Sequence, residues 1–304
     1  MSAAETAARR LAAVASPDRN LGSRTTYRVG GSAVAVIEVA DSEQLDDIAT
    51  VTAETGVATL VIGKGSNLLV ADAGFDGIAL MLGESFARVE VHGTTVVAGG
   101  MAALPVLARQ SAAGGLTGLE WAVGVPGSVG GGVRMNAGGH GSDIATTLRD
   151  VEVVDLASAH RGRRSADELR LGYRSSNLAA HHLVVEASFQ LEPGEVESSQ
   201  AEIAEIVRWR RDHQPGGANA GSVFQNPTGD SAGRLIDQAG AKGLREGSAV
   251  VSEKHANFIQ VDDGGSAADV YRLMERVAAA VFEHSGVRLT PETRLVGFPE
   301  WETA

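Results

Sequence analysis

The sequence contains no cysteine. This absence excludes disulfides, iron–sulfur clusters, thiol nucleophiles and a cysteinyl link to a flavin, so any redox chemistry must come from a bound cofactor. Aromatic residues are also scarce, at 4% of the chain, which argues against a stacking platform for single-stranded nucleic acid. No apolar run reaches the roughly 18 residues of a membrane span, and the first residues lack a secretory apolar core. We therefore expect a cytoplasmic protein with no membrane partner.

Positive charge is in deficit, because 26 Lys and Arg residues against 38 Asp and Glu residues give a formal net charge of -12. Proteins that bind a phosphate backbone are usually basic, so we expect no nucleic-acid partner. An anionic ligand would need a local positive site. Two arginine clusters are candidates, and for the first an ordinary solvated surface is favoured: Arg161, Arg163 and Arg164, then Arg208, Arg210 and Arg211.

The length of 304 residues favours two domains. Strands, helices and a hairpin follow one another in irregular order, which predicts an α+β fold rather than a doubly wound sheet. The expected elements of the first part are strands at 34–39, 59–62, 151–155 and 183–189, a helix between a cap at Asp41 or Ser42 and Gly56, a hairpin around His92 and Gly93, and a helix near 102–113.

A first boundary is expected at 191–195, where Pro193 and Gly194 interrupt the pattern after a strand. A helix should follow from Ser198 or Ser199 and end before Pro215. A second long helix should start at Ser266 and stop at Gly286, and a strand should follow at 293–298. The apolar positions expected on the buried faces of the two helices are Ile203, Ile206 and Val207, then Val270, Leu273, Met274, Val277 and Val281.

The run from Gly124 to Gly141 holds more glycine than any other stretch. Glycine adds nothing to a core, so such a run is typical of backbone that lies against a ligand, and bare amides there favour a pyrophosphate cradle. The alternative is a tight-turn or connector region. Neither this run nor the loop at 63–67 matches the dinucleotide-binding or P-loop glycine motifs.

In addition to the glycine run, three segments place polar residues in what look like loops: 172–176, 220–227 and 289–294. Taken alone, Ser222 is more simply a loop hydrogen-bonder and Glu292 a surface carboxylate. The surroundings of Ser222 lack the nucleophile elbow of a hydrolase, although the glycine before it and the apolar pair after it could hold its hydroxyl in one direction.

Read together, these segments resemble the UDP-N-acetylenolpyruvoylglucosamine reductase (MurB) family, in its short form. The resemblance spans about residues 21–298. It rests on nine motifs in the family's order: Thr25-Thr-Tyr-Arg-Val-Gly-Gly-Ser32, Ile62-Gly-Lys-Gly-Ser-Asn-Leu-Leu69, Gly118-Leu-Glu-Trp121 leading into Gly124-Val-Pro-Gly-Ser-Val-Gly-Gly131, Met135-Asn-Ala-Gly138, Tyr173-Arg-Ser175, Gly221-Ser-Val-Phe-Gln-Asn-Pro227, Ala232-Gly-Arg-Leu-Ile236, Ser252-Glu-Lys-His255 and Pro291-Glu292.

The resemblance implies an FAD enzyme of peptidoglycan synthesis that uses NADPH to reduce UDP-N-acetylglucosamine enolpyruvate to UDP-N-acetylmuramate. It implies an α+β fold with two subdomains of the PCMH, or vanillyl-alcohol-oxidase, type and a separate substrate-binding domain. The expected ranges are an N-terminal helical segment at 1–24, the FAD domain at 25–193 with subdomains of about 25–88 and 89–193, the substrate domain at 198–292, and a strand at 293–304 that returns to the FAD domain. A monomer is expected.

The resemblance also implies roles for individual residues. The catalytic set would be Arg174, Ser222 and Glu292, and substrate would meet Asn226 and Arg294, with Arg211 as a further candidate. FAD would lie along Gly63, Lys64, Gly65, Ser66, Asn67 and Leu68, and along Pro126, Gly127, Ser128, Gly130, Gly131, Asn136, Ala137 and Gly138.

These residue types suit the chemistry. Hydride addition to the enolpyruvyl methylene leaves negative charge on the neighbouring carbon and its carboxylate, which a cation such as Arg174 would stabilise. Glu292 could help to hold the enol form. The intermediate is a strong base, so an ordinary serine hydroxyl at Ser222 is acidic enough to protonate it.

Three residues depart from the family pattern: Lys64 where glycine is common, His140 where an aromatic is frequent, and His213 where lysine is expected before Gln-Pro. His213 would weaken phosphate binding, and Arg211 is the candidate to compensate for the missing lysine. We expect His140 to make no covalent flavin link. The histidines at 181, 182 and 255 show no ligand spacing, so no metal is expected. The alternatives are another flavin oxidoreductase of this fold or a noncatalytic flavin- or UDP-sugar-binding paralogue.

Overall fold

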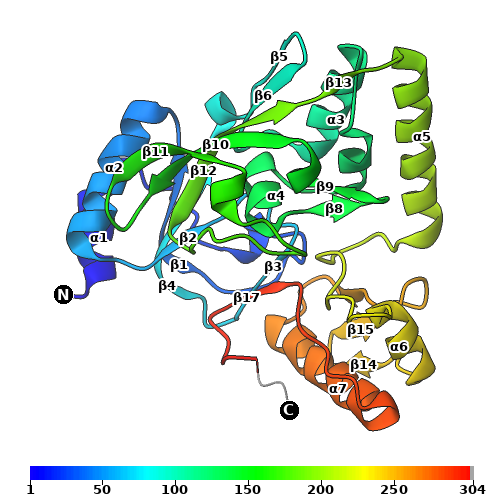
Figure 1. Ribbon diagram of the computed structural model, residues 1–304. Coiled ribbons are helices and arrows are strands. Elements are labelled where there is room, and N and C mark those ends of the chain that lie inside the picture. The colour runs from blue at the N-terminus through cyan, green and yellow to red at the C-terminus, as the bar shows by residue number, and fades with distance from the viewer. Residues whose placement is uncertain (302–304) are drawn as a thin grey trace. The chain divides into compact units, whose positions relative to one another are not determined.

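A computed structural model describes residues 1–301 of the chain (Figure 1). The chain forms two compact units. Unit 1 comprises Met1–Arg19, Val34–Lys64 and Asp76–Arg210, and unit 2 comprises Asn20–Ala33, Gly65–Phe75 and the chain from Arg211 on. The predicted domain boundaries stay a prediction. In unit 2, two segments that lie mostly within the predicted FAD domain, 20–33 and 65–75, pack with the C-terminal part of the chain.

The centre of unit 1 is an antiparallel five-stranded sheet in the order β11-β10-β12-β6-β5. Alternate residues of its long strand β12 enter different cores: Val184 belongs to one apolar cluster, whereas Leu183 and Val185 belong to another. The sheet is therefore covered on both faces. Its strands are β5 (Val89–His92), β6 (Thr95–Gly99), β10 (Leu148–Asp155), β11 (His160–Ser165) and β12 (His182–Gln190).

One face of this sheet packs against the helices α3 and α4. Of the two, α4 makes the more extensive contact with the sheet, at β12. The hairpin around His92 and Gly93 and the helix near 102–113 are confirmed. The elements on this side are α3 (Leu104–Ala113), β7 (Leu116–Thr117), η3 (Glu120–Gly124), α4 (Val129–Met135), β8 (Gly138–Gly139), β9 (Ser142–Asp143), η4 (Ile144–Thr146), η5 (Asp167–Leu169) and β13 (Glu192–Pro193).

The other core of unit 1 contains a three-stranded sheet in the order β1-β4-β2 and two helices. The predicted helix after residue 41 is confirmed at both ends, because the Asp41 side chain accepts the Gln44 N–H and Gly56 closes the helix with φ +62°. The elements are α1 (Ala3–Arg10), β1 (Ala33–Val39), α2 (Ser42–Thr55), β2 (Thr59–Val61), β4 (Phe75–Leu82) and η2 (Glu84–Phe86).

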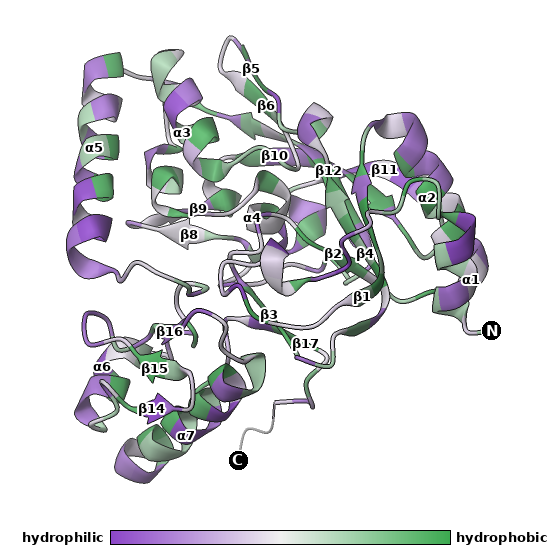
Figure 2. Cartoon of the chain, turned by 180° about the vertical axis from the view of Figure 1, so that it is seen from behind, coloured by the Kyte–Doolittle hydropathy of each residue, from purple (hydrophilic) through white to green (hydrophobic). Residues whose placement is uncertain are grey.

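Helix α5 (Val196–His213) begins two residues before its predicted start and ends before Pro215, as predicted. Its hydrophilic and hydrophobic residues alternate along the helix (Figure 2). Ile203 and Ile206 are buried, but the prediction that Val207 is buried is wrong, since 42% of this residue is exposed. Ser199 takes the buried position instead and donates a hydrogen bond to Glu120 across 2.5 Å.

Unit 2 is built on the long helix α7 (Ala267–Ser285). Its predicted start at Ser266 and stop at Gly286 are confirmed, since Ser266 is the N-cap and Gly286 closes the helix with φ +70°. All five predicted apolar positions of this helix are buried. Strand β17 (Arg294–Val296) pairs in parallel with β3 (Leu68–Val70). The remaining elements are η1 (Gly22–Arg24), α6 (Ala232–Gln238) and the antiparallel sheet β14 (Arg245–Glu246), β15 (Ala249–Val251) and β16 (Ile259–Val261).

Glycines let the separate segments of unit 2 approach one another at the backbone. A Cβ at Gly74, where φ is +86°, would overlap the Ser32 carbonyl oxygen. A Cβ at Gly65, where φ is +63°, would overlap the Arg24 carbonyl oxygen. At these positions glycine is required because another part of the same protein lies against it.

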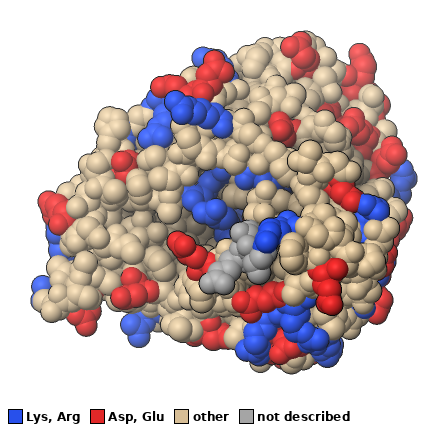
Figure 3. Space-filling view, turned by 60° about the horizontal axis from the view of Figure 1, so that its bottom comes forward, with Lys and Arg blue, Asp and Glu red and all other residues tan. Residues whose placement is uncertain are grey.

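The arginine cluster on β11 lies on the surface, as favoured above. Arg161 contacts Glu152 at 2.5 Å and Asp46 at 3.2 Å, and Arg163 contacts Glu186 at 3.1 Å. Carboxylates thus compensate these charges within unit 1. Basic and acidic side chains are likewise interspersed over the face drawn in Figure 3.

Gly74→Ala should destabilise the protein more than Gly93→Ala. Both positions have positive φ, which costs alanine about 1 kcal/mol, but the space around Gly93 is open. Only at position 74 must two backbone segments move apart, which should add roughly 2 kcal/mol. Urea unfolding of both variants measures the difference. Equal losses would mean that segments 20–33 and 65–75 are not packed as described.

Candidate functional site

The glycine-rich run forms a helix start whose amides are already used. The N–H groups of Val129 and Gly130 donate to the carbonyls of Ala102 and Gly100, and the N–H of Gly131 donates to the Ser128 hydroxyl. Bare amides for a pyrophosphate are therefore not available at 129–131. The small size of Gly130 instead lets α4 approach β12, since a Cβ there would lie 3.2 Å from the Val184 carbonyl oxygen.

Two of the predicted cofactor segments meet in unit 1. A Cβ at Gly63 would overlap the hydroxyl oxygen of Ser128, so the loop after β2 touches the start of α4. Beside this contact is a cavity of about 50 Å³. Its lining includes Gly63, Ser128, Gly130 and Gly131, together with Arg134 and His182.

The loop at 63–66 provides what the glycine run does not. Within the described residues, the main-chain N–H groups of Gly63, Lys64, Gly65 and Ser66 donate to no protein group. Consecutive amides of this kind, in a loop that contains glycine with φ +63°, fit an anionic group such as the pyrophosphate of FAD. The chain therefore fits the cofactor best at this loop and at the Gly63 side of the cavity.

Asn136 anchors the turn that carries Arg174. Its buried side-chain amide donates to the Gly172 carbonyl at 3.0 Å and to Asp143 at 3.1 Å, and its oxygen accepts the Ala145 N–H. The side chain is thus committed to the protein. Any contact of Asn136 with a cofactor would have to come from its backbone.

Arg174 lies in a tight turn closed by two hydrogen bonds between Gly172 and Ser175. Its backbone has φ +51°, which an arginine rarely adopts, and its Nη2 donates to the Gly138 carbonyl at 3.0 Å. The turn and the guanidinium are therefore both held in place within unit 1. Strain of this kind is frequent at functional sites.

Ser222 and Glu292 are brought together in unit 2 by the backbone of Val223. The Val223 carbonyl accepts the Glu292 N–H at 2.8 Å, and the Val223 N–H donates to the Asn257 carbonyl at 2.9 Å. The side chain of Asn257, which is buried, makes two further bonds to the backbone of Phe224. Asn257 was not predicted as a functional residue, although it lies only two residues after the quoted Ser252–His255 motif.

Asn67 connects the predicted flavin loop to the same strand. Its Nδ2 donates to the Glu292 carbonyl at 3.0 Å, and its main-chain carbonyl accepts the Arg294 N–H at 3.1 Å. Asn67, Ser222 and Glu292 therefore belong to one hydrogen-bonded backbone arrangement within unit 2.

The predicted substrate residues have different surroundings. Asn226 accepts the Ala232 N–H at the start of α6. Arg294 is exposed at the start of β17, and Arg211 has a largely exposed side chain beside Asp212. Lys254 donates to the Arg211 carbonyl at 2.5 Å, which places a lysine near the position where the family's lysine is replaced by His213.

His140, whose role was open, packs against α5 of its own unit. Its ring meets the Trp209 ring edge-on, with 5.2 Å between the ring centroids, and a Cβ at Gly124 would contact both His140 and Ile206. The aromatic position of the family therefore serves here as a packing contact for a helix.

In residues 1–301, Asp155, His181 and His182 lie close enough together to suggest a metal site. The hydrogen bonds of His182 oppose this. Its Nδ1 accepts the Ala179 N–H at 3.0 Å, so the proton of the neutral ring is on Nε2, which lies 3.4 Å from the Arg164 guanidinium. Neither nitrogen offers a lone pair to a cation.

Two family models match different parts of the chain. A model described as FAD binding domain matches residues 33–160, which contain Gly63, Ser128 and Asn136. Together with the α+β fold and the unpaired loop amides, this match defines a protein of the FAD-binding class.

A second model, the C-terminal domain of UDP-N-acetylenolpyruvoylglucosamine reductase, matches residues 213–296. Curated proteins named UDP-N-acetylenolpyruvoylglucosamine reductase are similar along nearly the whole chain. The one from Symbiobacterium thermophilum is 42% identical over 283 residues, which are 92% of each chain. That from Rubrobacter xylanophilus is 41% identical over 292 residues, 95% of this chain and 98% of the relative.

A solved structure agrees with these relatives. The UDP-N-acetylenolpyruvylglucosamine reductase (MurB) of Thermus caldophilus superposes with a TM-score of 0.80 at 36% identity, over 91% of this chain and 97% of that chain. The chain therefore belongs to the UDP-N-acetylenolpyruvoylglucosamine reductase family. Among residues 1–301, no helix is both long and apolar enough to cross a membrane.

The stability of the protein should fall on acidification in a way that depends on His182. Burial, and then the charge of Arg164, lower the pKa of His182 below its ordinary value of 6.5. The unfolded chain therefore binds this proton more readily, and stability present above pH 6.5 is lost as the pH falls. Unfolding of His182→Gln should show a flatter pH dependence, by up to about 1.4 kcal/mol per pH unit.

His160→Gln, which replaces an exposed histidine on β11 of the same unit, is the control variant with which the pH profile of His182→Gln is compared. An unchanged profile in His182→Gln would show that this ring is not held neutral in the folded protein.

Proposed function

We propose that this protein is a UDP-N-acetylmuramate dehydrogenase, which reduces UDP-N-acetylglucosamine enolpyruvate with NADPH and FAD in peptidoglycan precursor synthesis. The observation that carries the proposal is family membership along more than nine-tenths of the chain, with Arg174, Ser222 and Glu292 present in the motifs that resemble the family. The acidic charge of the chain is compatible with a monomer in the cytoplasm, which we include in the proposal.

The residues for FAD would be those of the two loops, 63–68 and 126–138. The unpaired amides of Gly63, Lys64, Gly65 and Ser66 are the strongest support, since they match the oxygens of a pyrophosphate. When bound, FAD accepts a hydride from NADPH and delivers it to the enolpyruvyl methylene carbon. The protein supplies orientation and charge.

Ser222 would supply the proton that completes the reduction. Hydride addition makes the methylene carbon a methyl group and leaves an electron pair on the adjacent carbon, and the Ser222 hydroxyl protonates that carbon. Solvent then returns the proton to Ser222. The half-buried position of Ser222, with Val223 bonded on both sides, supports a fixed direction of approach.

Arg174 and Glu292 would stabilise the charge that precedes protonation. A guanidinium attracts the carboxylate and the negative charge that develops beside it, and preorganised interactions of this kind contribute on the order of 3 kcal/mol. The bond from the Arg174 guanidinium to the Gly138 carbonyl and the backbone bond from Glu292 to Val223 support preorganisation. Asn226, Arg294 and Arg211 would meet the UDP-sugar.

The proposal is tested by purifying the protein and releasing its flavin by denaturation. NADPH oxidation under anaerobic conditions should stop after about one equivalent and resume when UDP-N-acetylglucosamine enolpyruvate is added. A protein that takes up no FAD would be a noncatalytic paralogue. Continued oxidation with another alcohol or sugar, but not with this one, would identify a different flavin oxidoreductase.

Ser222→Ala should slow reoxidation by the enolpyruvyl sugar by roughly a hundredfold or more, because the carbon loses its proton donor. NADPH-dependent reduction should change by less than about threefold. Stopped-flow absorbance of the flavin separates the two steps. Ser285→Ala, which removes a hydroxyl bonded only to the backbone of Val281 and Val287 at the C-terminal end of α7, is the control and should change neither step. Equal losses in both steps for Ser222→Ala would refute its role as proton donor.

A further inference from the structure

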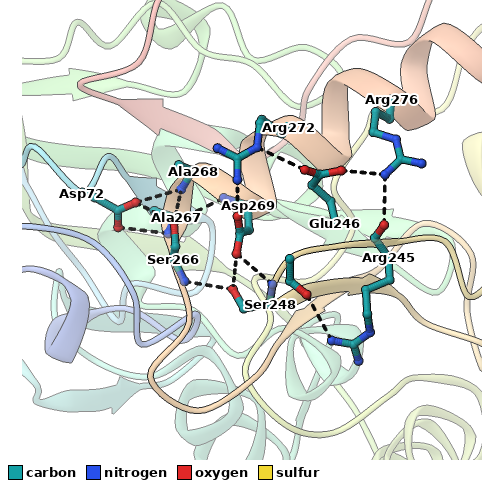
Figure 4. A network of polar contacts seen from close by, with 11 residues as sticks. Asp72, Arg245, Glu246, Ser248, Ser266, Ala267, Ala268, Asp269, Arg272 and Arg276 are labelled. Carbon is teal, nitrogen blue, oxygen red and sulfur yellow. Dashed lines mark hydrogen bonds and ion pairs between the residues drawn. The ribbon is translucent and has the colours of Figure 1, made fainter.

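Asp72 joins the segment after the flavin loop to helix α7 of the same unit. Its carboxylate accepts three hydrogen bonds at the helix start, from the Ser266 hydroxyl at 2.8 Å and from the N–H groups of Ala267 and Ala268 at 3.0 Å each (Figure 4). A residue almost 200 positions away along the sequence therefore shares the capping of α7 with Ser266.

The charge of Asp72 suits this position. First-turn N–H groups have no partner inside a helix, and the helix dipole favours an anion at this end. Burial alone would raise the pKa of Asp72, but the bonds from Ala268, Ala267 and Ser266 outweigh it, and the pKa lies below its ordinary value. The carboxylate is ionised at neutral pH.

The helix start is itself held in place from the opposite side. Ser266 donates its N–H to the Ser248 hydroxyl at 3.0 Å, and the hydroxyl and N–H of Ser248 both donate to Asp269 at 2.7 Å (Figure 4). Arg272 extends this network to Glu246. Asp72 therefore bonds to a helix start that is itself fixed by hydrogen bonds to another part of unit 2.

Asn67 lies in the same segment as Asp72, five residues earlier in the chain. It bonds to the backbone of Glu292 and Arg294, as described above. Between Asn67 and Asp72 lies β3, which in residues 1–301 pairs only with β17, over three residues. The Ala71 N–H adds one bond to the Val296 carbonyl. A two-stranded sheet of this length is marginal by itself, so its register needs anchors at its ends.

We propose that Asp72 is a positioning residue: by holding β3 against α7 it sets the position of Asn67, and through Asn67 the backbone of Glu292. This inference rests on the proposed function, in which Glu292 stabilises charge during reduction of the enolpyruvyl group. Displacements of about 1 Å in such a group can slow a reaction by up to a hundredfold.

The test replaces Asp72 by Asn in the full-length flavoprotein. Asparagine keeps the shape but removes the charge and turns an NH₂ group toward the N–H donors of α7. Asp41→Asn is the matched control, because Asp41 also caps a helix, α2 of unit 1, through the Gln44 N–H, and contacts no flavin loop. Both variants remove a carboxylate charge from the N-terminus of a helix.

Asp72→Asn should slow reoxidation by the enolpyruvyl sugar by roughly tenfold or more, while reduction by NADPH changes by less than about threefold. Hydrogen exchange of the Glu292 and Arg294 amides should accelerate. Asp41→Asn should alter neither rate step nor these amides. Ser266→Ala removes one of the three bonds to Asp72 together with the cap bonds that Ser266 accepts from Ala268 and Asp269. It should accelerate the same exchange and slow the same reoxidation step, and it tests the proposal if Asp72→Asn does not fold.

Reoxidation rates and exchange that match those of Asp41→Asn would overturn the proposal. The exchange measurement needs no substrate, so it separates this inference from the proposed function. If the wild-type flavin is not reoxidised by the sugar, the proposed function fails, whereas accelerated exchange at Glu292 would still show the connection from Asp72.

Discussion

The arrangement of unit 2 depends on the docking of residues 65–75 against the C-terminal part of the chain. This short segment provides β3 to pair with β17, Asn67 to bond with the strand that carries Glu292, and Asp72 to cap α7. Its close contact with residues 20–33 requires Gly65 and Gly74, where any side chain would overlap a carbonyl of the neighbouring segment. Residues 65–68 of the loop proposed to bind FAD therefore belong to the unit that carries Ser222 and Glu292.

Hydrogen bonds from the backbone, more than side-chain packing, determine where the proposed catalytic groups lie. Val223 is bonded to Asn257 on one side and to Glu292 on the other, so Ser222 has little freedom. In unit 1, Asn136 holds the turn of Arg174. Two buried asparagines thus have corresponding tasks, since each uses its amide to fix a loop that carries a functional residue. Such preorganisation lets charge be stabilised without rearrangement during the reaction.

The sequence predicted what is local and left out what depends on distant segments. Caps at Asp41 and Ser266 and the stop at Gly286 followed from residues next to each helix end, and the structure confirms them. The prediction that Val207 is buried was wrong, because the contact of Ser199 with Glu120 sets which side of α5 faces the core. The partners of Asp72 and Asn257 are far away in the sequence, so no local pattern could indicate their roles.

Native-state hydrogen exchange in the wild-type protein, measured with increasing urea, tests the central claim most directly. The account predicts that the amides of Ala71, Glu292 and Arg294 open in the same cooperative transition as those in the middle of α7, because segment 65–75 and β17 belong to one packed unit. Opening of Ala71 and Arg294 at a clearly lower free energy than α7 would contradict it, since the flavin loop and Glu292 would then not be held together.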